Sequence, residues 1–200
     1  MSDIRKARSA VVERRTKETS VRVELALAPG PIDVSSGVGF LDHLLTSLAF
    51  HGGFSLSLSC DGDLRVDDHH SAEDCALALG AALREALGDK AGVRRFGSAY
   101  APLDESLARA VVDLSGRPCA VVDLGLTREA IGGLACENVA HVVASLANAA
   151  TATIHLDVLR GSNDHHRAEA AFKALALALR EATAIDAGYG DAVPSAKGAL

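Results

Sequence analysis

The chain has 200 residues, of which 48% are hydrophobic and 23% are charged, and its formal net charge is -6 at neutral pH. This length suits one globular domain or two small halves packed together. The negative charge argues against a nucleic-acid partner bound through a broad basic face, so an anionic substrate would need cations placed locally.

The cysteines and the N-terminus indicate the cellular compartment. No two cysteines form a Cys-x-x-Cys pair, which argues against a thiolate zinc site and favours a reducing, cytoplasmic compartment. The N-terminus is charged throughout, which is not typical of a signal peptide. Residues 43–60 and 139–156 lack Asp, Glu, Lys and Arg, and their length approaches that of a membrane span. Because both contain histidines and small polar residues, we expect each to be a helix end followed by a strand, with no membrane partner.

The first half of the chain predicts strands and two helices. Residues 5–28 read as a strand after a charged lead-in, because "TSVRVELAL" alternates apolar and polar residues. Residues 37–53 predict a helix closed by glycines, and residues 54–60 predict a half-buried strand. Residues 67–88 predict a long amphipathic helix, with Asp68 or Ser71 as its N-cap.

After further strands with a turn at Ser115-Gly116, the second half repeats this order. Residues 135–150 predict a helix, residues 151–159 a strand and residues 163–183 a long helix. When His69 is aligned with His165, Asp68 matches Asp164, which favours Asp68 over Ser71 as the cap. We therefore expect one domain over residues 1–200, with duplicated halves at about 5–100 and 101–200, in an α+β or α/β sandwich.

Histidines and glutamates occupy corresponding positions in the two halves. The repeated set contains His43, His69, His70, Glu73, His141, His165, His166 and Glu169. One histidine alone is usually a core or surface residue, but six in duplicate register with two glutamates indicate metal binding.

Helix geometry suggests how these residues divide between ions. His69 and Glu73 lie four residues apart on one helix face, whereas His69 and His70 diverge by about 100°. Adjacent histidines should therefore serve different ions, which predicts two sites of three histidines and one glutamate. Four protein ligands leave open positions on an octahedral ion, as catalysis requires. Two chains could also share one ion, so that metal binding drives assembly.

Several motifs in order give a more specific resemblance. They include "GVGFLDHLL" at 37–45, "GDLRVDDHHSAED" at 62–74, "PLDESL" at 102–107, "DLSGRP" at 113–118, "HLDVLRGSNDHHRAEAAFKALALAL" at 155–179 and "PSAKG" at 194–198. In these motifs the chain resembles the imidazoleglycerol-phosphate dehydratases of histidine biosynthesis. The resemblance implies two βαβ-like halves, similar to the second domain of ribosomal protein S5, and a cytoplasmic 24-subunit homo-oligomer assembled through manganese sites.

The resemblance also implies roles for individual residues. The eight repeated histidines and glutamates would hold two divalent metal ions, Mn²⁺ in particular. The substrate phosphate would be bound by Arg95, Arg117, Lys173, Ser195 and Lys197. Glu18 would contact the substrate and act as the catalytic acid and base. From the residues alone, Glu18 could equally be one charge of a solvated segment, and "PSAKG" a frayed tail.

The implied reaction is dehydration of imidazole glycerol phosphate to imidazole acetol phosphate. The proton to be removed lies on a carbon with no adjacent carbonyl, so the reaction needs an electron sink. An ion on the substrate imidazole would favour its imidazolate, which can expel the hydroxyl to give a diazafulvene. A carboxylate can then take the neighbouring proton.

Two other functions fit part of the pattern. A two-metal hydrolase of a phosphate ester would need a bridging carboxylate, which the histidine-dominated set does not clearly supply. A metal-storage shell would have no use for the predicted phosphate cations. Asp42, Asp67 and Asp68 flank the ligands and are candidates for orienting imidazoles.

Overall fold

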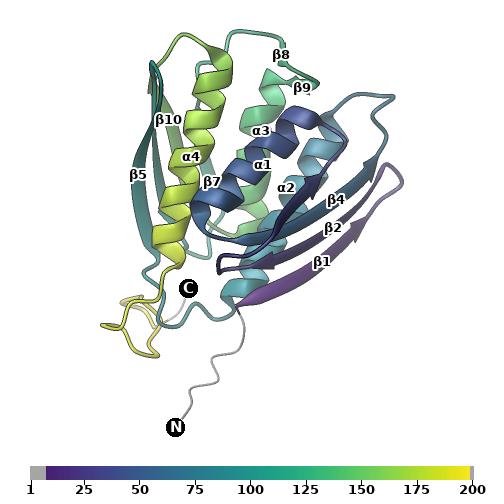
Figure 1. Cartoon of the computed structure of the whole chain (residues 1–200). Coiled ribbons are helices and arrows are strands. Elements are labelled where there is room, and N and C mark those ends of the chain that lie inside the picture. The colour runs from purple at the N-terminus through teal and green to yellow at the C-terminus, as the bar shows by residue number, and fades with distance from the viewer. Residues whose placement is uncertain (1–7, 199–200) are drawn as a thin grey trace.

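The structure, a computed structural model, describes residues 8–198 as two four-stranded sheets with helices packed between them, and a third sheet of two short strands (Figure 1). The first half contains β1 (Ser9–Arg15), β2 (Thr19–Ala26), β3 (Ile32–Ser35), α1 (Gly39–Gly52), β4 (Ser55–Gly62) and α2 (His69–Leu87). The second contains β5 (Phe96–Leu103), β6 (Ser106–Asp113), β7 (Cys119–Asp123), β8 (Ala130–Ile131), β9 (Leu134–Ala135), α3 (Cys136–Ala150), β10 (Thr153–Arg160) and α4 (Asp164–Thr183).

The two four-stranded sheets have the same topology. Their strand orders are β1-β2-β4-β3 and β5-β6-β10-β7. In each sheet the first two pairs are antiparallel and the last pair is parallel. The predicted α+β fold with duplicated halves is confirmed. Residues 43–60 and 139–156 do form helix ends followed by strands. No helix among the described residues is both long enough and apolar enough to cross a membrane.

Within residues 5–28 the predicted strand at "TSVRVELAL" is β2, but the strand β1 in the charged lead-in was missed. The structure has two antiparallel strands there, joined by a turn at residues 16–18. The turn contains no glycine or proline, and the mostly charged residues 13–18 run from β1 into it, so the sequence does not mark where the first strand ends. The strand β3 was also missed, because it has only four residues at the sheet edge.

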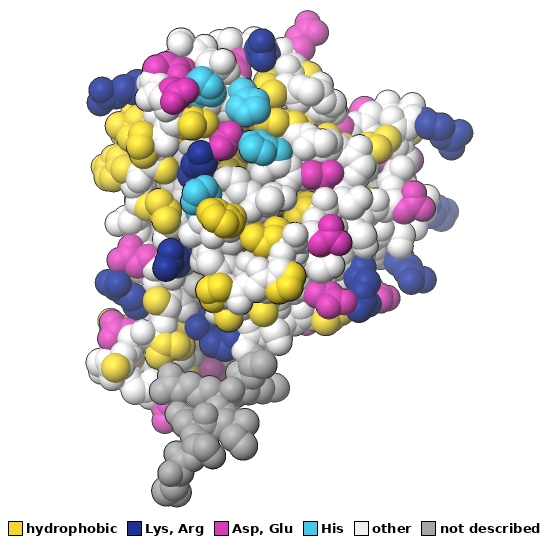
Figure 2. All heavy atoms as spheres, in the orientation of Figure 1, with side chains coloured by type: hydrophobic (Ala, Val, Ile, Leu, Met, Phe, Trp, Pro, Cys, Tyr) yellow, Lys and Arg dark blue, Asp and Glu magenta, His cyan; other side chains and the backbone are white. Residues whose placement is uncertain are grey.

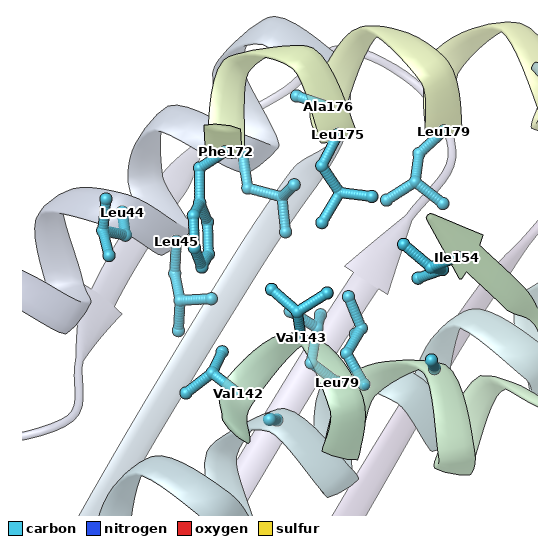
Figure 3. Close-up of a cluster of buried hydrophobic side chains, with 14 of the residues drawn as sticks. Leu44, Leu45, Leu79, Val142, Val143, Ile154, Phe172, Leu175, Ala176 and Leu179 are labelled. Atoms are coloured by element: carbon cyan, nitrogen blue, oxygen red, sulfur yellow. The ribbon is translucent and has the colours of Figure 1, made fainter. Parts of the chain in front are cut away.

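Each helix packs against a helix from the opposite half. The contacts pair α1 with α4 and α2 with α3, while α2 and α4 also lie on the sheets. Apolar side chains fill the space between them, as Figure 3 shows for Leu44 and Leu45 of α1 and for Phe172 of α4. Phe172 is the largest fully buried side chain in the described chain. This packing brings the start of each long helix against a helix of the other half.

The helix ends depend on glycine and on loop contacts. Gly53 closes α1 in the left-handed conformation (φ 69°), as the glycine pair predicted. Asp68 occupies the N-cap position of α2, but its side chain does not cap the helix. Its Oδ2 instead accepts the Ala135 N–H (2.7 Å) and an Asn138 Nδ2–H (3.0 Å). The predicted capping role of Asp68 was therefore wrong, because the loop entering α3 uses this carboxylate.

Candidate metal centres and substrate site

One cluster lies where α1 meets α4. His43, His165 and Glu169 each offer a ligand atom, and these atoms lie within 4.8 Å of one another. Nε2 of His43 is 2.9 Å from Glu169 Oε2, and Nε2 of His165 is 3.3 Å from the same oxygen. On α4 the two ligands are four residues apart, so they share one helix face. The duplicated halves thus bring ligands together that lie more than 100 residues apart in the chain.

The second cluster lies where α2 meets α3. It combines His69 and Glu73 with His141, again within 4.8 Å. His141 Nε2 is 3.2 Å from Glu73 Oε1, and the rings of His69 and His141 are stacked with centroids 4.8 Å apart. Histidine and acidic side chains gather on the upper part of the face shown in Figure 2. Each cluster offers two imidazole nitrogens and one carboxylate oxygen, a donor set that suits Mn²⁺, Zn²⁺ or Fe²⁺ and leaves coordination positions open.

His70 and His166 belong to neither cluster of the described chain. The ring of His70 is turned 74° from that of His69, and the ring of His166 is turned 90° from that of His165. Nδ1 of His70 is 3.1 Å from an Asp63 oxygen, and Nδ1 of His166 is 2.7 Å from Glu105 Oε2. A single chain therefore brings two histidines and one glutamate to each cluster, where three histidines and one glutamate were predicted.

The two clusters differ in charge. Nζ of Lys173 is 2.7 Å from Glu169 Oε1, whereas Leu77 stands at the corresponding place after Glu73. Burial raises the pKa of Glu169, but its contacts with Lys173 and His43 outweigh burial and lower that pKa to about 2. This carboxylate is thus ionised over the whole physiological pH range, as a metal ligand must be.

Hydrogen bonds also affect His70 and His166, which we call the outward histidines because their rings turn away from the cluster of their own chain. The hydrogen bond to Asp63 raises the pKa of His70, and the hydrogen bond to Glu105 raises the pKa of His166. A metal ion that binds either ring must displace a proton held more tightly than in free histidine.

Of the three aspartates expected to orient imidazoles, none touches a ligand ring. Asp42 accepts the Ser36 N–H and hydroxyl, and Asp67 accepts the backbone N–H of His69. Both predictions were wrong, because these carboxylates stabilise the turns that precede the helices. Asp68 contacts a ligand ring only indirectly, because it accepts a hydrogen bond from Asn138, whose Oδ1 lies next to the His69 ring.

Asn138 is a site residue that sequence reasoning missed. Its side chain is buried, its Nδ2 donates to Asp68, and its Oδ1 lies 3.0 Å from Nδ1 of His69. It precedes His141 by three residues on α3, so the helix period could have placed it beside the cluster. Asp63 and Glu105 were also missed, since no spacing in the sequence connects them to His70 and His166.

The predicted phosphate residues divide between two ends of α4. Arg95 lies at the C-terminal end, where its N–H donates to the Ala182 carbonyl (2.9 Å). Its guanidinium donates to Asp113 (2.7 and 3.2 Å) and to the carbonyl of Pro194 (2.8 Å), the residue before Ser195. At about 1.5 Å per residue, α4 separates Ala182 from His165 by about 25 Å.

The other predicted phosphate residues are also divided between the two ends of α4. Arg117 follows Leu114, whose N–H donates to the Arg95 carbonyl (3.1 Å), and the Lys197 N–H donates to Ser195 Oγ (3.2 Å). Lys173, in contrast, pairs with Glu169 at the metal end. In a single chain these side chains do not converge on one phosphate.

Glu18 lies in the turn between β1 and β2, with an exposed side chain. Its N–H donates to Thr16 Oγ1 (3.1 Å), which shapes the turn. The carboxylate makes no hydrogen bond with another described residue, but its charge contributes to raising the pKa of His70. Glu18 is therefore on the histidine side of the molecule.

Comparison with known proteins gives a consistent result. The family model "Imidazoleglycerol-phosphate dehydratase" matches residues 36–179. The chain is 51% identical over 216 residues to the enzyme of that name from Saccharomyces cerevisiae, covering 96% of this chain and 97% of the yeast protein. It is 57% identical over 192 residues to that from Neurospora crassa, covering 92% and 84%.

Two solved structures have the same fold. The dehydratase from Staphylococcus aureus superposes with a TM-score of 0.80 at 36% identity, covering 88% of this chain and 100% of the other. The Pyrococcus furiosus protein, in complex with (S)-C348, superposes with a TM-score of 0.81 at 39% identity, covering 94% and 100%. The chain therefore belongs to the imidazoleglycerol-phosphate dehydratase family of hydro-lyases.

Proposed function

We propose that this chain dehydrates imidazole glycerol phosphate to imidazole acetol phosphate with two divalent ions, which we assign as Mn²⁺. The observation that carries the metal proposal is the pair of His–His–Glu clusters at the α1–α4 and α2–α3 contacts. In this proposal His70 and His166 complete the ligand set. When bound, the ions supply the positive charge that favours an anionic imidazole ring on the substrate.

Glu18 is proposed as the group that moves the substrate proton. Its carboxylate is exposed, makes no hydrogen bond within residues 8–198, and lies close enough to His70 to affect its pKa. Such a carboxylate can take the proton from the carbon next to the departing hydroxyl, and the resulting enol becomes the ketone.

The phosphate is proposed to be bound by residues from more than one chain. About 25 Å of helix lies between the His165 end of α4 and Arg95, whereas the substrate's short glycerol chain separates its imidazole from its phosphate. Arg95, Arg117, Ser195 and Lys197 of one chain would therefore meet the clusters and Lys173 of another. Arg95 is suited to this role because Asp113 already holds its guanidinium in place.

The proposed assembly rests on the two adjacent histidines of each half. In each His-His pair one ring joins a cluster of its own chain and the other points elsewhere. We propose that the outward rings complete ions held by neighbouring chains in a homo-oligomer, for which the family resemblance suggests 24 subunits, working in the cytoplasm. Closed symmetric assembly would repeat each shared site around the particle.

The test uses chelator-stripped protein, imidazole glycerol phosphate and stepwise addition of Mn²⁺. Ketone formation and particle mass are followed together. We expect both to rise until about two ions per chain are bound. Assembly without ketone would refute the dehydration, release of inorganic phosphate would favour a hydrolase, and uptake of many ions per chain would favour storage.

A further inference from the structure

Glu105 sits in the tight turn between β5 and β6, and the backbone fixes one of its carboxylate oxygens. Oε1 accepts the N–H groups of Ser162 (3.0 Å) and Asn163 (2.9 Å). The loop can approach this closely because Gly161 has no side chain, since a Cβ there would lie 2.3 Å from Ser106 Oγ. The orientation of the Glu105 carboxylate is thus determined before any ligand binds.

The other oxygen of Glu105 faces a predicted metal ligand. Oε2 is 2.7 Å from Nδ1 of His166. A carboxylate can only accept a hydrogen bond, so Nδ1 of His166 must carry a proton. In a neutral ring the lone pair is then on Nε2, which is the nitrogen left free to bind a metal ion.

In the other half of the chain a carboxylate also contacts Nδ1 of the corresponding histidine, His70, but it comes from a different loop. Asp63 contacts Nδ1 of His70 at 3.1 and 3.2 Å, but Asp63 follows β4 whereas Glu105 precedes β6. By topology the counterpart of Glu105 is Glu18, because each directly precedes the second strand of its sheet. Since the two carboxylates are not related by the duplication, their common contact points to a shared requirement of the outward histidines.

We infer that Glu105 is a positioning residue, which holds His166 in the Nδ1–H tautomer and presents Nε2 to an ion shared with another copy of the chain. The inference rests on the proposed function, because it assumes that His166 is a metal ligand. It also assigns different tasks to two topologically equivalent glutamates. Glu18 remains exposed for proton transfer, whereas Glu105 is committed to a histidine.

The substitution Glu105→Gln tests the tautomer directly. The two backbone N–H groups would keep the amide oxygen in place of Oε1, so the NH₂ group would face Nδ1 of His166. Because an NH₂ group donates, Nδ1 would have to accept, and the proton would move to Nε2 and block it. Glu105→Ala leaves the tautomer free but removes the acceptor of both loop N–H groups. Asp104→Asn is the control for loss of charge, because it removes the other carboxylate near His166, 3.9 Å from Nε2, and leaves the Glu105 hydrogen bond intact.

The readout is Mn²⁺ affinity, measured from the electron paramagnetic resonance signal of free Mn²⁺, alongside the thermal midpoint of metal-free protein. For one of the two ions per chain we expect Glu105→Gln to weaken binding about 10- to 100-fold. Glu105→Ala should weaken it less, although it should lower the thermal midpoint more. Asp104→Asn removes the same charge as Glu105→Gln but should weaken binding less than Glu105→Gln and leave the thermal midpoint unchanged.

Glu105→Gln should lose more Mn²⁺ affinity and Glu105→Ala more thermal stability. A purely structural role for Glu105 would instead make both properties fall together. If Glu105→Ala lost more metal affinity and more stability than Glu105→Gln, the tautomer argument would be overturned. Wild-type Mn²⁺ affinity in Glu105→Gln would overturn the tautomer argument as well. If Glu105→Ala fails to fold, the comparison of Glu105→Gln with Asp104→Asn still tests the argument. Failure of the wild-type chain itself to bind Mn²⁺ would instead refute the proposed metal sites, and the inference with them.

Discussion

Replacing Asn138 with leucine should weaken one metal site and spare the other. The substitution removes the Oδ1 acceptor of the His69 ring and the Nδ2 donor to Asp68. Loss of the hydrogen bond to a charged group costs about 1.5–3 kcal/mol, and burial of leucine offsets a similar amount. Asp68 keeps the Ala135 N–H, so we expect the free energy of unfolding to change by no more than about 1 kcal/mol.

The effect on metal affinity should be larger and specific to one cluster. Loss of a partner that orients a ligand typically costs 10- to 100-fold in affinity, or about 1.4–2.7 kcal/mol. In the His43 cluster the corresponding position is Phe40, whose ring packs 5.0 Å from that of His165, so that cluster has no amide at this position to lose. A calorimetric Mn²⁺ titration should therefore change from two similar sites to one strong and one weak site. Equal weakening of both sites, or none, would refute the reasoning.

Three further outcomes follow from the structure. Phe172→Ala should lower the free energy of unfolding by about 3–5 kcal/mol in denaturant titrations, whereas Phe50→Ala, at a position 70% exposed, should change it by less than about 0.5 kcal/mol. The hydrogen bond to Glu105 raises the pKa of His166, so its contribution to metal-free stability is present at low pH and is lost as pH rises through that pKa. Because the same hydrogen bond favours the doubly protonated ring, Mn²⁺ must displace a proton from Nε2 of His166. Affinity should therefore fall as pH is lowered below neutrality, with proton release detectable by calorimetry in buffers of different ionisation enthalpy. Glu18→Gln should leave Mn²⁺ binding and particle mass unchanged while slowing turnover about 10²- to 10⁴-fold, and an unchanged rate would remove Glu18 from the mechanism.

The sequence predicted elements well where their periodicity was long and their ends were marked. The four helices and the strands β4 and β10 lie where pattern and glycine closure placed them. The strand β1 was missed because it ends in charged residues and its turn into β2 contains no glycine or proline. The pairing of α1 with α4 could not be predicted, because both long helices repeat the same pattern and either could face the shorter helix of its own half.

The sequence predicted the candidate ligands but not their hydrogen-bond partners. Duplicate register identified eight histidines and glutamates without any contact information, and six of them gather in the two clusters. Asn138, Asp63 and Glu105 depend on the packing of loops against helices, and nothing in local spacing indicates which carboxylate reaches which ring. Asp68 illustrates the difference, because its position suggested a helix cap and its actual partners come from the loop entering α3.

We propose that one active site is built from different chains, and complementation between two inactive variants would show whether it is. Arg95→Met would lack the phosphate contact, and His165→Ala would lack a metal ligand. Mixed after metal removal and reassembled with Mn²⁺, random association should restore roughly a quarter of wild-type turnover, because only sites with both intact halves work. Such recovery is the result predicted here. A mixture no more active than its two components, in particles of mixed composition, would show that each chain forms its own site and would contradict the account.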